Sequence, residues 1–122
     1  MNKNEAEILM LMQSVRNKYF KDIENSISFY VVKRADIQES VHGRMLYLAD
    51  GSIEIYLYYS DDRILEHQYR WGLVPIIAHE LSHIINPVEP DIVLAGRLPE
   101  SIVRTWNEFK ESGAVECSFG EE

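Results

Sequence analysis

The stretch "VPIIAHELSHIINP", residues 74–87, combines a bounded helix with two histidines four positions apart. Pro75 stands where the first turn of a helix tolerates proline, and Pro87 follows Asn86 at a point where a helix normally stops. The segment therefore predicts a helix of about three turns. Most of its other residues are apolar, so we expect this helix to be largely buried.

On such a helix His79 and His83 project from the same side, one turn apart, so both imidazoles can reach one metal ion. Glu80 follows His79 directly and therefore lies about 100° further round the helix, where its carboxylate can reach a water on that ion without being a ligand. Zinc in a catalytic site takes three protein ligands and a water, whose pKa it lowers to about 7. We therefore predict His79 and His83 as zinc ligands and Glu80 as the general base, which passes the proton to the leaving amine.

The alternative is a helix whose two histidines have no metal between them. Buried histidines need hydrogen-bond partners or a metal, and the apolar neighbours of His79 and His83 favour burial. A protein without metal would contain no zinc by elemental analysis and would melt at the same temperature with and without chelator. The remaining histidines, His42 and His67, are expected to be surface or loop residues.

Upstream of the motif, the hydrophobic pattern indicates one helix and a small sheet. Residues 4–22 carry apolar side chains at spacings of three and four, which predicts a helix, and residues 26–34 read as a strand. Residues 44–60 contain two alternating runs that meet at Asp50-Gly51, the signature of a tight hairpin. We place the strand 52–60 at the sheet edge beside the site, where an extended peptide could add as a further strand.

After the hairpin, the sequence is less decisive. Residues 61–72 fit a short helix or a structured loop, and residues 87–99 contain three prolines and a glycine, which favours a loop. A last helix is expected to start near Pro99. The fold class is thus α+β: an N-terminal helix, a small twisted, mainly antiparallel sheet of three or four strands, the HELSH helix and a C-terminal helix. Residues 1–122 are interpreted as a single domain.

Composition limits the partners and the compartment. Twenty acidic against twelve basic residues give a net charge of −8, which disfavours nucleic acid. Neither a signal peptide nor a run of about 20 apolar residues is present, so no membrane association is expected. The single cysteine, Cys117, cannot form an internal disulfide, which fits the cytoplasm. The expected partner is a peptide or protein substrate, and the sequence does not fix the oligomeric state.

The order helix, sheet, HELSH helix and further helix with a glutamate resembles the zincin superfamily of metallopeptidases. More narrowly it is similar to the gluzincin clan in its minimal form, the minigluzincins. This resemblance implies a zinc peptidase in which His79 and His83 are zinc ligands and Glu80 is the general base. It also implies that a glutamate on the last helix is the third ligand.

Three glutamates near the C-terminus compete for that role. Glu111 is the main candidate, because in related gluzincins a small residue often follows the ligand by three positions, as Ala114 does here. An Asp often follows by four, but Val115 stands there, so the group that orients a metal-bound histidine is missing or supplied elsewhere. Glu108 and Glu116 are the alternatives, the latter nearer the apolar stripe of the expected last helix.

Two further ligand sets were considered. The longer metzincin motif, H-E-x-x-H-x-x-G-x-x-H, would place Asn86 and Glu89 at its last two positions, but Pro87 restricts residue 86 to extended conformations. All four methionines precede the motif, so the methionine turn of that group has no counterpart. Cys117 could act as a ligand if the C-terminal segment folded back onto the site.

The function expected from these residues is hydrolysis of peptide bonds by a zinc-dependent metallopeptidase. The alternative is a non-catalytic zinc-binding or protein-interaction domain of zincin-like fold. Glu80 favours catalysis, because a structural zinc site has no use for a base beside a water. Candidates for stabilising the oxyanion are Tyr56, Tyr58, Tyr59 and Arg97.

Overall fold

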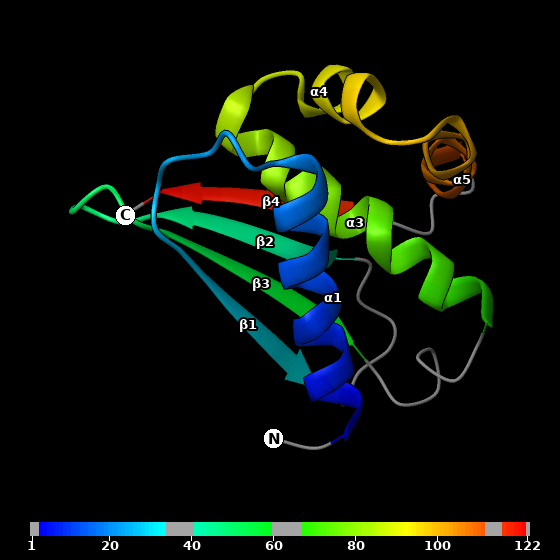
Figure 1. Cartoon of the computed structure of the whole chain (residues 1–122), viewed down its shortest axis with the longest axis horizontal. Coiled ribbons are helices and arrows are strands. Elements are labelled where there is room, and N and C mark those ends of the chain that lie inside the picture. Colours follow the sequence, from blue (N-terminus) through cyan, green and yellow to red (C-terminus); the bar gives the residue numbers. More distant parts are fainter. Residues whose placement is uncertain (1–2, 34–40, 60–66, 112–115, 122) are drawn as a thin grey trace.

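The computed structural model describes residues 3–33, 41–59, 67–111 and 116–121 (Figure 1). Side chains at 41–42, 67–72 and 116–121 lie outside this description. The elements in chain order are α1 (Lys3–Tyr19), β1 (Ile27–Lys33), β2 (Val41–Tyr47), β3 (Ile53–Tyr59), α3 (His67–Ile85), α4 (Pro90–Arg97), α5 (Glu100–Glu111) and β4 (Glu116–Glu121). The predicted α+β class is confirmed.

The described strands form one sheet in the order β1-β3-β2-β4. β1 pairs with β3 in parallel, β2 with β3 antiparallel, and β4 with β2 in parallel. The expectation of a mainly antiparallel sheet was therefore wrong. Among these three pairings, only that of the hairpin strands β2 and β3 is antiparallel. The expectation that the strand 52–60 forms an edge was also wrong: β3 lies inside the sheet, which fits its alternation of fully buried and half-buried residues.

The predicted hairpin joins β2 to β3. Gly51 has φ of 86°, a conformation open to glycine without a steric penalty. The Leu48 amide donates to the Ser52 carbonyl at 2.9 Å, and the Asp50 carboxylate accepts from the Ser52 amide at 2.9 Å. Local turn chemistry thus fixes the pairing of these two strands, as the Asp-Gly dipeptide predicted.

Helices α1 and α3 pack against each other and against the sheet (Figure 1). Ile8, Met12 and Val15 of the stripe predicted for the first helix are buried, and the core continues into α3 and the inward side chains of β3. No helix in the described part of the chain is long and apolar enough to cross a membrane.

Helix α3 is longer than its sequence boundaries suggested. It begins at His67 rather than near Pro75, so Pro75 lies within the helix. The missing N–H of Pro75 removes one bond of the helical ladder, and the packing of Leu73, Ile76 and Ile77 in the core offsets that loss. The side chain of Tyr47 on β2 donates to the Ile84 carbonyl at 3.2 Å, which ties the last turn of α3 to the sheet.

The segment after α3 contains a helix where a loop was expected. The Asn86 side chain accepts from the amides of Val88 and Glu89 at 3.2 and 3.0 Å, and Pro90 then occupies the first helical position of α4. Proline at that position is favourable because its nitrogen needs no partner. The predicted helix near Pro99 is confirmed as α5, but the alternative that placed Glu116 on it was wrong, because Glu116 begins β4.

Candidate metal centre

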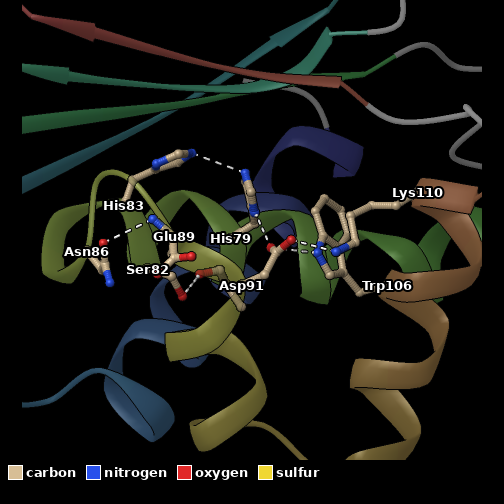
Figure 2. A network of polar contacts seen from close by, with 9 residues as sticks. His79, Ser82, His83, Asn86, Glu89, Asp91, Trp106 and Lys110 are labelled. Carbon is tan, nitrogen blue, oxygen red and sulfur yellow. Dashed lines mark hydrogen bonds and ion pairs between the residues drawn. The ribbon is translucent and has the colours of Figure 1, made fainter.

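The two histidines of the HELSH motif face each other on α3, as predicted (Figure 2). His79 Nε2 and His83 Nε2 are 3.1 Å apart, and the ring planes meet at 83°. Two zinc–nitrogen bonds of 2.0–2.1 Å at a tetrahedral angle would separate the nitrogens by about 3.3 Å. The observed separation is close to that required by a shared ion, and it is also that of an N–H···N hydrogen bond between the two rings.

Asp91 on α4 fixes the orientation of the first histidine. His79 Nδ1 is 2.9 Å from Asp91 Oδ1 (Figure 2). An ionised carboxylate only accepts hydrogen bonds, so Nδ1 carries the hydrogen and donates it to Asp91. In the neutral imidazole the lone pair is then on Nε2, the nitrogen that faces His83. This is the arrangement in which a carboxylate prepares a histidine for metal binding.

Helix α5 holds Asp91 in its ionised form. Trp106 Nε1 donates to Asp91 Oδ1 at 2.9 Å, and Lys110 Nζ pairs with Asp91 Oδ2. Burial raises the pKa of Asp91, but the hydrogen bonds from His79, Lys110 and Trp106 together outweigh it and hold that pKa well below its usual range. The Trp106 ring also packs on His79 with centroids 4.8 Å apart. The first histidine is thus restrained from two sides.

His83 has a different environment. Its side chain is buried, and burial followed by the proximity of His79 lowers its pKa below the ordinary value, despite opposing contributions from the Pro87 backbone and Asp91. A lowered pKa keeps the imidazole neutral at neutral pH. The neutral form is the one that binds a metal.

Glu80 lies between this pair and the sheet. Its side chain is fully buried, and one carboxylate oxygen and the ligand nitrogens of His79 and His83 all lie within 4.8 Å of one another. The carboxyl group is next to Gly43 of β2: a Cβ added to that glycine would be 3.0 Å from Glu80 Cγ and 3.2 Å from Cδ. The absence of a side chain at this point of β2 leaves room for the carboxylate.

The candidates for a third ligand are placed elsewhere. Glu108 and Glu111 have exposed side chains on α5, and within the described residues neither belongs to the His79, Glu80, His83 group. The face of α5 turned to the site carries Trp106, and Glu108 and Glu111 lie about 200° and 140° round the helix from it. Glu116 and Cys117 are on β4, with side chains outside the described residues. The assignment of Glu111 stays a prediction.

Sequence reasoning missed Asp91, Trp106 and Lys110. The sequence left open which group orients His79, and the structure shows that Asp91 contacts its ring from a segment interpreted as a loop. The dipeptide Pro90-Asp91, a proline followed by an acid, is a helix-start signal that could have identified α4.

Three of the side chains considered for the oxyanion have other partners. Tyr59 is buried and donates to Glu5 of α1 at 3.0 Å, and Arg97 pairs with Asp22 beyond the end of α1. Tyr56 donates to Glu54 on the same strand and stacks on Tyr30.

No family model matches this chain, and no curated protein or solved structure matches it. The assignment of function therefore depends on the geometry of the site.

Replacing Asp91 by Asn is expected to lower the affinity for zinc by about 10- to 100-fold, the usual cost of losing a group that orients a metal-bound histidine. Asparagine keeps the shape but not the charge, so the polarisation of His79 through Nδ1 is lost. The measurement is a competition titration with a chromophoric chelator. Asp22→Asn, which removes an exposed carboxylate paired with Arg97, is the matched control. Equal affinity in both variants would contradict the role of Asp91.

Gly43→Ala is expected to destabilise the fold by about 1–3 kcal/mol, because the added methyl group crowds the buried Glu80 side chain. Urea denaturation measures this effect. Gly96→Ala is the control: a Cβ there meets nothing within 4 Å, and alanine in a helix is favoured over glycine by up to about 1 kcal/mol. A Gly43→Ala protein as stable as Gly96→Ala would show that Glu80 is not confined against β2.

Proposed function

We propose that this protein is a zinc-dependent peptidase of zincin type. The observation that carries the proposal is the pair of Nε2 atoms, 3.1 Å apart, with Asp91 behind one ring and the buried Glu80 beside both. A chance pair of histidines has no need for a carboxylate that selects the tautomer in which the Nε2 lone pair of His79 faces the other ring and can bind a cation. This arrangement supports a metal centre, and Glu80 supports a hydrolytic one.

When bound, zinc would act as a Lewis acid on the substrate carbonyl and lower the pKa of a water to about 7. The side chains of the protein hold the ion and transfer the proton. His79 and His83 hold the ion, and Asp91 keeps the ring of His79 in place. Glu80 accepts one proton of the attacking water and donates it to the nitrogen of the leaving amine as the scissile C–N bond breaks, and the second proton of the water stays on the new carboxyl group.

The proposal includes Glu111 as the third protein ligand, on the strength of the resemblance alone. Its exposed position at the end of α5 means that it would have to turn toward α3 on metal binding. Zinc titrations of Glu111→Gln and Glu108→Gln decide between the two residues, with Glu24→Gln, an exposed carboxylate between α1 and β1, as the control. If all three bind zinc like the parent protein, neither α5 glutamate is a ligand.

The direct test is hydrolysis of unfolded casein by the zinc-loaded protein. Activity should disappear with chelator and return with added zinc, and elemental analysis should find one zinc per chain. Zinc binding without hydrolysis would favour the non-catalytic zinc-binding domain, and no zinc at all would remove both proposals. A peptide substrate and a cytoplasmic location belong to the same proposal.

A further inference from the structure

Strand β1 is one edge of the described sheet. The order β1-β3-β2-β4 places β3 on one long side of β1 and no described strand on the other, and Figure 1 shows this edge far from β4. Natural edge strands are usually protected by a proline, a bulge or a charge within the strand. The sequence of β1, "ISFYVVK", contains no proline or glycine, its only charge is the terminal Lys33, and its seven residues pair with β3 without a register shift. Within the described residues this edge is therefore open to another strand.

The backbone groups on the outer side of β1 belong to alternate residues. The amide of Ile53 at the start of β3 donates to the carbonyl of Ser26 at 2.9 Å, so residue 26 directs its backbone groups toward β3. In a parallel pair, residues that bond to the neighbouring strand alternate with residues whose N–H and C=O point the other way. The even-numbered residues of β1 therefore continue the pairing with β3. Phe29 and Val31, like the other odd-numbered residues, direct N–H and C=O outward.

A row of tyrosines reaches this edge. The side chains of the even-numbered residues of β1 point away from the core, because those of the odd-numbered residues pack against it. Among them, Tyr30 stacks on Tyr56 of β3 with ring centroids 4.9 Å apart and planes at 18°, and Tyr56 also stacks with Tyr58. Tyr30 is 41% exposed and Val32 is 37% exposed. A further strand beside β1 would cover apolar surface of both side chains.

A second copy of β1 matches these features. In an antiparallel pair whose two-fold axis passes through Tyr30, the central residue of the strand, all seven residues overlap, and any shift of the axis shortens the overlap. Phe29 of one copy then faces Val31 of the other, and both direct N–H and C=O across the interface, as a hydrogen-bonded antiparallel pair requires. The two Tyr30 residues form a non-hydrogen-bonded pair, in which side chains approach closest. The tyrosine row of one copy thus continues into that of the other.

The charges of β1 favour the antiparallel direction. In this register Lys33 faces Ile27 of the other copy, so the two Lys33 residues are separated by six residues along the strand, about 20 Å. A parallel pair in the same overlap would instead place the two lysines side by side, and like charges directly opposite each other are destabilising. The antiparallel pair therefore contains no repulsion between its only charged side chains.

We propose that this protein forms a symmetric homodimer through β1, in which two four-stranded sheets join into one sheet of eight strands. The partner is thus a second copy of this chain, recognised by main-chain hydrogen bonds and by the stacked tyrosines. Helix α3 packs mainly on β2, so the two candidate metal centres lie away from the interface. The inference is independent of the proposed peptidase function.

The first test is the mass of the full chain in solution. At physiological ionic strength, which screens the net charge of −8 per chain beyond about 8 Å, sedimentation equilibrium should approach twice the mass of one chain, 14.2 kDa, as concentration rises. Val31→Pro removes an outward donor and no bond to β3. It should raise the dissociation constant at least about tenfold, because the symmetric dimer loses that hydrogen bond twice.

Val31→Ala is the matched control, because it shortens the same side chain but keeps the backbone N–H. It should dimerise like the parent protein. A parent protein that stays monomeric at every concentration would overturn the inference. A dimer that Val31→Pro does not weaken would also overturn it, because such a dimer is formed by another surface.

Disulfide cross-linking locates the two-fold axis and needs no proline. In a Cys117→Ser background, Tyr30→Cys should form an intermolecular disulfide on mild oxidation, because the Cα atoms of a non-hydrogen-bonded pair are about 4.5 Å apart. Ser28→Cys is the matched control at an exposed position of the same face. Its two copies are offset by four residues, about 13 Å, which is beyond the reach of a disulfide. Equal cross-linking of the two variants, or faster cross-linking of Ser28→Cys, would overturn the inference.

Discussion

Glu80→Gln is expected to reduce casein hydrolysis by about 10²- to 10⁴-fold, the range over which a positioned general base accelerates a reaction. Glutamine has nearly the shape of glutamate but cannot accept the proton of the attacking water at neutral pH. The side chain is fully buried beside Gly43, so an isosteric replacement retains the packing there. Zinc content should remain that of the parent protein, because Glu80 is proposed as a base and not as a ligand.

The control for this experiment is Glu24→Gln, which makes the same chemical change at an exposed position. It should hydrolyse casein at the parent rate. If Glu80→Gln and Glu24→Gln are both as active as the parent, hydrolysis comes from a contaminant or from another residue. If zinc is lost from Glu80→Gln alone, Glu80 is a ligand rather than the base.

His83→Ala is expected to have the largest effect on metal binding. Loss of an outer partner of a metal site costs about 10- to 100-fold in affinity, so loss of a direct ligand should cost more than about 100-fold. The consequence is visible in thermal stability. Zinc at about 100 times its dissociation constant stabilises a protein by about 2.7 kcal/mol, which raises the melting temperature of a domain of this size by about 10 °C. His83→Ala should show no such increase at the same zinc concentration.

His67→Ala serves as the control, since His67 is also on α3 but lies three turns before the motif. It should keep the full zinc-dependent increase in melting temperature. The parent protein treated with chelator should melt as it does before zinc is added. A zinc-dependent increase that survives in His83→Ala would place the metal elsewhere in the chain.

Local sequence signals determined much of this fold. The spacing of Ile8, Met12 and Val15 predicted α1, and the dipeptide Asp50-Gly51 predicted the β2–β3 hairpin. These predictions held because a helix face and a tight turn depend on side chains a few positions apart. The boundaries near Pro75 and Pro90 failed, because both prolines were taken as ends or interruptions. One lies within a helix and the other begins one.

The facing pair His79 and His83 was also determined by the sequence itself, since four residues are about one turn of any helix. What only the tertiary structure decided is what surrounds this pair. Asp91, Trp106 and Lys110 come from two other helices, and Gly43 comes from a strand far earlier in the chain. The order of the strands, with β3 inside and β4 along β2, was decided in the same way. The periodicity of a segment fixes which of its faces is apolar but not which distant segment covers that face, and that choice is made by packing of the whole chain.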